Sequence, residues 1–250
     1  MSINYVITQL YYNIAIILTK HILTMKKVIL SALTVGFLFV SGSTFAQISV
    51  GPKLGLNIST IAADDETGLP DTKSKVGFQL GGVLNAQLND YFAIRPELLF
   101  NNVGAKFDEK GLTGSLNTNY LSLPVNFVGQ YPVSENFKLQ AFAGPYAALG
   151  LGGKYKFESA SGEQSGSVKM GKVPSNDVSD NFYMNSLDFG LNFGIGAQVS
   201  SFLITANYGL GLTNLQPHYK DSADEDTRDE DGKMYNRNIT IGVAYLFGGK

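Results

Sequence analysis

Hydrophobic and polar residues alternate along the segment from Ser186 to Thr213, with one interruption at Ser200-Ser201. An alternating pattern places apolar side chains on one face of an extended strand and polar or small side chains on the other. The segment therefore predicts a β-hairpin with one apolar face. Each strand is about twice the usual length of roughly 5–6 residues, and a tilted strand needs roughly 9–11 residues to cross a bilayer.

The same alternation recurs after residue 47 and predicts further strands elsewhere in the chain. They occupy about residues 48–59, 76–88, 91–106, 120–128, 137–153 and 239–247. With the hairpin, the pattern predicts eight strands that follow one another in sequence. An even number of consecutive strands can close into an up-and-down barrel, in which no strand is left with a free edge.

Short and long connections alternate between these strands. The short ones are Asn89-Asp90, Ser134–Asn136 and Ser200-Ser201, and the long polar ones fall near residues 60–74, 107–117, 154–185 and 214–235. Bacterial outer membrane barrels have short periplasmic turns, longer outer loops and an even strand number. We therefore predict an all-β fold, an eight-stranded antiparallel transmembrane up-and-down β-barrel of the bacterial outer membrane. The long connections then lie outside the cell.

Periodicity alone leaves open which face of the barrel is apolar. The alternative is a soluble eight-stranded cup such as a lipocalin, with an apolar lumen and a charged exterior. Here the polar face consists mostly of Gly, Ser, Asn and Gln, and the chain holds 28 glycines. Small residues suit the interior of an eight-stranded barrel, which is just wide enough for its side chains. We predict that the apolar face contacts lipid.

Residues 25–46 have the pattern of a cleavable signal peptide. Lys26-Lys27 precede an apolar run from Val28 to Val40, and small residues lead to a cleavage site after Ala46. Such a signal implies export from the cytoplasm, which a barrel of the outer membrane requires.

Residues 1–24 are then interpreted as an upstream extension of the reading frame, and residues 47–250 as the outer membrane β-barrel. The alternative is a membrane helix over Tyr5–Leu18. That segment is shorter than the ~20 residues of a comfortable span and contains Gln9 and Asn13, so we favour the extension.

Prolines occur inside several predicted strands, at Pro52, Pro96, Pro124 and Pro145. Proline has no N–H to donate, and a closed barrel offers no free edge where this would be harmless. We expect bulges or local breaks of the hydrogen-bond ladder there.

Four short motifs give the chain a resemblance to a known family. They are Arg95–Phe100 (RPELLF), Tyr120–Val125 (YLSLPV), Ala143–Tyr146 (AGPY) and Asp188–Leu191 (DFGL). Because of these four motifs, the chain resembles the small Bacteroidetes-type outer membrane β-barrel proteins, also called PorT-like or "porin family" proteins. The resemblance covers about residues 47–247. The resemblance implies an eight-stranded barrel without catalytic residues, assembled by the barrel-assembly machinery. For the PorT branch it implies a link to protein secretion.

Charged residues on the polar face give the first candidate site. Lys53, Arg95 and Glu97 lie at similar distances from the periplasmic ends of their strands. A charge in so narrow a lumen must be paired or hydrated, because an unpaired buried ion costs several kcal/mol. We predict a Lys53–Glu97–Arg95 cluster that closes the barrel, and the alternative is three hydrated charges in a wet channel.

The last long loop holds the other candidate chemistry. Its acidic residues include Asp224, Asp226, Asp229 and Asp231, a candidate weak cation-binding loop. Alignment to a Ca²⁺-binding loop fails at both ends, so a solvated acidic loop is the favoured interpretation.

His218 of the same loop has Ser222 close in sequence, as a nucleophile and base would require, but the spacing is generic. We predict a solvated histidine and no catalytic residue.

Composition excludes several function classes. The chain has no cysteine and a formal net charge of −2, so disulfide scaffolds, thiolate metal sites and nucleic-acid binding are not expected. No phosphate- or dinucleotide-binding motif occurs, and no cofactor or bound metal is predicted. Three functions remain. The first is a structural or interaction barrel, which has an extracellular or secretion-system partner or a role in envelope integrity. The second is a narrow pore for small solutes, and the third is a lipid-modifying or proteolytic barrel enzyme. We favour the first.

Overall fold

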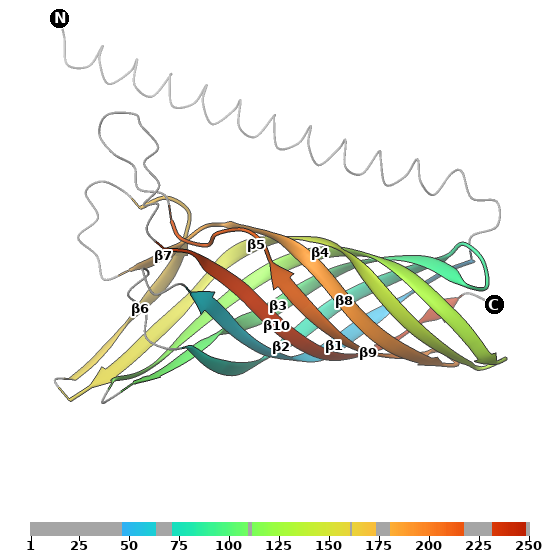
Figure 1. Ribbon diagram of the computed structural model, residues 1–250, viewed down its shortest axis with the longest axis horizontal. Coiled ribbons are helices and arrows are strands. Elements are labelled where there is room, and N and C mark those ends of the chain that lie inside the picture. Colours follow the sequence, from blue (N-terminus) through green and yellow to red (C-terminus); the bar gives the residue numbers. More distant parts are fainter. Residues whose placement is uncertain are drawn as a thin grey trace, which may run out of the picture. The chain divides into compact units, whose positions relative to one another are not determined.

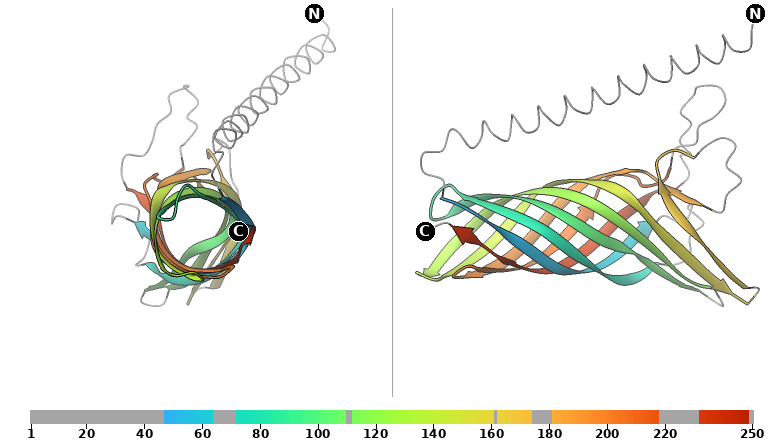
Figure 2. Two further views of the ribbon diagram at one scale, coloured as in Figure 1. Left: turned by 90° about the vertical axis from the view of Figure 1, so that its right-hand side faces the viewer. Right: turned by 180° about the vertical axis from the view of Figure 1, so that it is seen from behind.

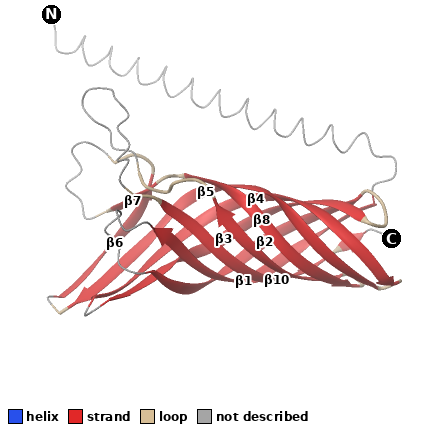
Figure 3. Cartoon of the chain, viewed as in Figure 1, coloured by secondary structure: helices blue, strands red, loops and turns tan. Residues whose placement is uncertain are grey.

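A computed structural model describes residues 47–63, 72–109, 112–160, 162–173, 181–217 and 232–248 of the protein. The regular elements in these ranges are all strands (Figure 3). Among the described residues, no helix has the length and apolar character that a membrane span requires. The expected signal peptide and upstream extension, residues 1–46, lie outside the described ranges.

Eight long strands form a closed antiparallel ring, which Figure 2 shows end on. They are β1 (Gln47–Ala63), β2 (Thr72–Gln87), β3 (Phe92–Glu109), β4 (Leu112–Ser134), β5 (Phe137–Ser159), β8 (Leu187–Val199), β9 (Phe202–Gly211) and β10 (Met234–Tyr245). Each strand pairs with its neighbours in the chain order of this set, and β10 pairs with β1 to close the ring. The eight-stranded barrel predicted from the alternation is confirmed.

Three short strands lie outside this set: β6 (Gly162–Met170), β7 (Phe182–Met184) and β11 (Phe247–Gly248). β6 pairs antiparallel with the outer part of β5, and β7 pairs parallel with β6. β11 pairs with the beginning of β1. The expectation of loops near 107–117 and 154–185 was therefore wrong for most of these residues. These strand segments are rich in Lys, Glu and Ser, a composition that resembles that of polar loops.

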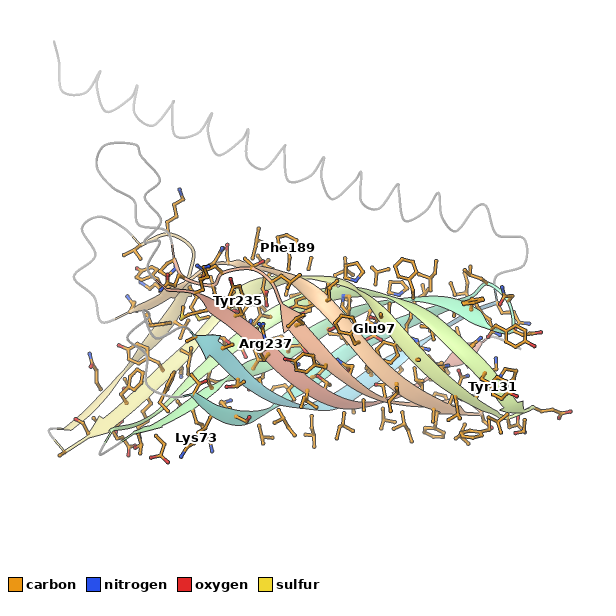
Figure 4. All side chains as sticks on the ribbon, in the orientation of Figure 1. Lys73, Glu97, Tyr131, Phe189, Tyr235 and Arg237 are labelled. Carbon is orange, nitrogen blue, oxygen red and sulfur yellow. The ribbon has the colours of Figure 1, made fainter. Side chains whose placement is uncertain are left out.

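The apolar face of the barrel points outward, as predicted. Leu54, Phe127 and Ile195 are 66%, 60% and 66% exposed, whereas Asn57 and Thr240 on the other face are fully buried. Figure 4 shows side chains projecting from the wall along its whole length, with Phe189 and Tyr131 on the outside. A soluble protein does not expose so continuous an apolar belt, and lipid is the environment that accommodates it.

The hydrogen-bond ladder is interrupted where prolines lie within strands. Between β2 and β3 the paired residues pass from Val83–Glu97 to Ala86–Ile94, and Pro96 lies in the gap. Between β4 and β5 they pass from Pro124–Tyr146 to Phe127–Ala143, and Pro145 lies in the gap. The register is unchanged across both gaps, so these prolines break the ladder locally without adding a bulge residue.

Aromatic rings of β5 pack against glycines of β8 inside the barrel. Phe142 lies opposite Gly194, and Tyr146 lies opposite Gly190. A Cβ atom at Gly194 would lie 2.3 Å from the Phe142 ring, and one at Gly190 would lie 2.5 Å from the Tyr146 ring. The inward glycines of β8 therefore provide the space that these rings fill.

Candidate functional site: the barrel lumen

A buried ion pair inside the barrel joins β1 and β3, the two strands that flank β2. Lys53 Nζ lies 2.7 Å from Glu97 Oε2, and both residues are 3% exposed. Gly81 of β2 lies directly opposite Lys53, between the two strands that carry the charges. Because Gly81 has no side chain, the lysine can extend past β2 to reach the carboxylate.

Arg95 makes a separate layer toward the short-turn end of the barrel. Its Nε donates to Asn85 Oδ1 at 3.1 Å, and its Nη2 donates to Gln140 Oε1 at 2.6 Å. The guanidinium carbon lies 5.9 Å from the centroid of the Phe142 ring, and Arg95 is fully buried. The structure thus brings Lys53 and Glu97 together, while Arg95 is held by amides of β2 and β5.

Amide side chains extend this inner layer around the ring. Gln140 Nε2 donates to Gln130 Oε1 at 3.4 Å and to Gln198 Oε1 at 3.3 Å, which links β5 to β4 and β8. Sequence reasoning did not identify Gln140 as an Arg95 partner. The available signal was the row of glutamines at inward positions near the short-turn end of the strands.

A second polar layer crosses the barrel farther out. Asn57 Oδ1 accepts from Thr240 Oγ1 at 2.9 Å, and Asn57 Nδ2 donates to Asn101 Oδ1 at 3.4 Å. Asn101 Nδ2 in turn donates to Ser122 Oγ at 2.9 Å. The chain of hydrogen bonds runs from β10 through β1 and β3 to β4, so neutral groups satisfy one another across the lumen.

Asp188 is a buried acid that the sequence analysis did not assign to the site. It is 2% exposed, and its Oδ2 accepts from Asn236 Nδ2 at 2.8 Å and from Tyr146 OH at 3.2 Å. The signal was present in the sequence as a single acid on a face made otherwise of Gly, Asn and Gln. Asp188 therefore joins β8, β5 and β10 from inside.

A small chamber lies between these layers, with a volume of about 70 Å³. Glu97, Asn126, Tyr146 and Asp188 are among its lining residues. Asn126 Oδ1 and Asp188 Oδ1 are buried and have no hydrogen-bond partner among the described residues. A polar space of this size accommodates a few water molecules, which can hydrogen-bond to such groups.

The outer end of the lumen is apolar. The buried residues of this outer apolar cluster are Ile61, Ala105, Phe107, Leu116, Tyr155, Val168, Met184, Leu215 and Met234. They come from β1, β3, β4, β5 and β10 of the ring, from β6 and β7, and from the segment that follows β9. Met184 and Leu215 are fully buried, so side chains fill the barrel at this level.

The remaining candidates fall where the structure gives no description. Asp224, Asp226, Asp229 and Asp231 of the acidic loop lie outside the described residues, and so does His218. Within the described ranges, no three or more His, Cys, Asp or Glu residues are grouped so that they could hold a metal ion. The weak cation-binding loop and the solvated histidine therefore stay predictions.

A closed ring of eight strands with an apolar exterior and a polar interior defines an integral β-barrel of the bacterial outer membrane. The family model for the outer membrane protein beta-barrel domain matches residues 45–216, and the chain belongs to this family. The Bacteroidetes or PorT-like subtype stays a prediction. Comparison with curated proteins finds no match.

Solved structures with a similar fold are distant in sequence. Ail, the attachment invasion locus protein of Yersinia pestis, is 17% identical with a TM-score of 0.37, over 80% of this chain and 98% of Ail. Neisserial surface protein A is 9% identical with a TM-score of 0.39, over 79% of this chain and 97% of that protein. The outer membrane protease OmpT of Escherichia coli is 12% identical with a TM-score of 0.30, over 81% and 96%.

Proposed function

We propose that this outer membrane barrel is a non-enzymatic interaction protein that meets an extracellular or secretion-system partner through its outer end. The observation that carries the proposal is the sheet of β4, β5 and β6, which continues past the ring at the end opposite the short turns (Figure 1). At that end β5 pairs with β4 as far as Ser159, and with β6 from Gly153 to Ser159. An ordered projection offers a partner a preformed surface.

The projecting hairpin of β5 and β6 is polar on its exposed side. Glu158 lies directly opposite Glu163, and the Lys156 ammonium forms ion pairs with both carboxylates. The hydrogen bonds that the Lys156 ammonium donates to Glu158 and Glu163 raise the pKa of Lys156. Such exposed pairs contribute little stability, and they give the tip a defined pattern of charge.

The lumen supports an interaction role over transport. Charged and amide side chains cross it at the inner layers, and the outer apolar cluster fills it beyond them. Eight-stranded barrels have interiors that side chains nearly fill. A barrel filled at two levels is better suited to present an outer surface than to pass solutes.

Site-specific crosslinking in intact cells tests the proposal. A photoreactive residue placed at Glu163 should crosslink to a discrete partner, and the same residue at Ser134, next to the turn at the other end, should not. A shortened variant that joins Lys156 to Ser165 through Asn-Gly removes the tip and keeps a two-residue hairpin. It should assemble normally and impair secretion or envelope integrity. Normal function of the assembled, shortened barrel would contradict an interaction through this tip.

The chamber inside the barrel favours a second candidate, a narrow pore for small solutes. The polar groups in its lining, such as Glu97 and Asp188, and its volume of about 70 Å³ would allow a hydrated section within the lumen. Conduction through this section would need openings in both the inner layers and the outer apolar cluster. Conductance measurements separate the two functions, because a steady open state belongs only to the pore.

A further inference from the structure

The outside of the wall changes from apolar to basic just beyond the lipid-facing belt at the outer end. Val76, Leu121 and Leu151 are exposed apolar residues at the edge of the belt. Beyond them, the outer parts of β2, β3 and β5 carry five lysines: Lys73, Lys75, Lys106, Lys154 and Lys156. Figure 4 labels Lys73 on the outside near this end of the barrel.

Burial of the neighbouring residues shows that Lys106 and Lys154 face outward. Lys106 lies between Ala105 and Phe107, which are 0% and 2% exposed and belong to the outer apolar cluster. Lys154 precedes Tyr155 of the same cluster. Because neighbouring residues of a strand point to opposite faces, Lys106 and Lys154 project from the outer wall.

A row of asparagines connects Lys75 to the same surface. Lys75 Nζ donates to Asn117 Oδ1 at 3.3 Å and to Asn102 Oδ1 at 3.4 Å. Asn102 Nδ2 donates to Asn117 Oδ1 at 2.8 Å and to Asn119 Oδ1 at 2.7 Å. Asn117 is the cross-strand partner of Lys154. The amides therefore hold the Lys75 ammonium within one strand of Lys154.

Three of the lysines have no acidic partner among the described residues. Lys73 pairs with Asp108, and Lys156 pairs with glutamates of the β5–β6 hairpin. Lys75, Lys106 and Lys154 form no ion pair within the described ranges, and we call these three the lysine cluster.

The pairing of β2 with β3 brings positively charged lysines close to one another. Lys106 lies directly opposite Lys73 on the neighbouring strand, and its charge also repels Lys75. Like charges directly opposite one another destabilise a sheet. An anion held between the lysines would relieve the repulsion.

We propose that the lysine cluster binds the phosphate groups of a phosphorylated glycolipid in the outer leaflet. The cluster lies directly beyond the apolar belt, at the level where lipid headgroups meet water. Long lysine side chains bury their methylene groups along apolar surface and keep the ammonium in the headgroup region. A phosphate offers several acceptor oxygens and up to two negative charges, which complements clustered ammonium groups beside asparagine amides.

Titration with a defined glycolipid tests the site. The full-length protein, purified in zwitterionic detergent, is titrated with labelled diphosphoryl lipid A. Replacing Lys75, Lys106 and Lys154 together by Gln should weaken binding about 100-fold, since each lysine near a lipid surface contributes about fivefold. Replacement of all three by Arg should retain most of the affinity. Raising the salt concentration should weaken the wild type and not the Gln variant.

Matched single substitutions keep the test valid if the triple variant fails to fold. Lys106→Gln should weaken binding about fivefold, while Lys138→Gln, which removes one charge at the other end of the barrel, should not change it. Equal binding by these two variants, or equal affinity for lipid A without phosphates, would overturn the proposal. Sucrose octasulfate binding as tightly as diphosphoryl lipid A would also overturn it, in favour of a soluble polyanion.

Discussion

At the scale of single residues, the lumen is governed by the cost of burying charge. The Lys53–Glu97 pair is almost completely buried, at 3% exposure for each residue. Removing one partner of such a pair leaves the other as an uncompensated charge, whereas replacing both with apolar residues of similar size is close to neutral. The attraction within the pair therefore adds little to stability. Loss of either partner would destabilise the barrel, because the remaining charge would be buried without a counter-charge.

Glu97→Gln should accordingly lower the free energy of unfolding by about 3 kcal/mol. The expected cause is Lys53, which would keep its positive charge within the lumen without a carboxylate. Urea titration of the barrel in detergent micelles, followed by intrinsic tyrosine fluorescence, measures the change. The double variant Lys53→Met with Glu97→Met serves as the control and should recover most of the loss. Equal stability of Glu97→Gln and wild type would mean that water compensates the lysine.

At the scale of the strand, the alternation of faces decides which substitutions the membrane tolerates. Phe193 of β8 is 44% exposed on the lipid side, and its neighbour Asn192 lines the internal chamber. One step along the strand therefore separates a lipid environment from a polar one. Inward glycines of the same strand are required by the rings of β5, as Gly194 and Phe142 illustrate.

Phe193→Arg should impair assembly, because an arginine facing lipid near the bilayer midplane costs about 2–4 kcal/mol. Asn192→Ser should have little effect, since serine also hydrogen-bonds in a polar lumen. The fraction of folded barrel, measured by the heat-dependent shift in gel mobility after refolding into vesicles, compares the two. Equal tolerance of both changes would show that the faces of β8 are wrongly assigned.

At the scale of the whole molecule, two different groups of buried side chains occupy the lumen one after the other along its axis. The inner one consists of the Lys53–Glu97 pair and the Arg95 layer, and the outer one is the apolar cluster around Met184. A polar constriction conducts if it hydrates, and an apolar one resists conduction because it excludes water. Opening only one of them leaves the other in place.

Planar-bilayer recordings should therefore show little steady conductance for the wild type. Arg95→Ala with Glu97→Ala, and Phe107→Ala with Met184→Ala, should each produce only a small rise. Combining the four substitutions should produce a clearly larger conductance than the sum of the two pairs. A large and stable wild-type conductance would contradict the closed lumen and favour the pore.

The sequence by itself determined the features that depend on local pattern. The alternation of apolar and polar residues predicted the strands and the two faces of each strand. The small uncharged residues of the polar face indicated that the apolar face contacts lipid. The same pattern put Lys53, Glu97 and Arg95 on one face at similar heights, but it did not show that Arg95 hydrogen-bonds to Asn85 and Gln140. Strongly polar strands such as β6 were missed, because their apolar residues are too few to stand out from a loop.

Only the tertiary structure decided which side chains meet across the lumen. Arg95 reaches Gln140 on β5, and Asp188 is held by Tyr146 and Asn236 from two other strands. These contacts depend on the stagger that closure imposes between strands, and no local pattern encodes that stagger. The outer apolar cluster and the lysine cluster have the same origin, since each gathers residues from strands far apart in the sequence at one height of the barrel.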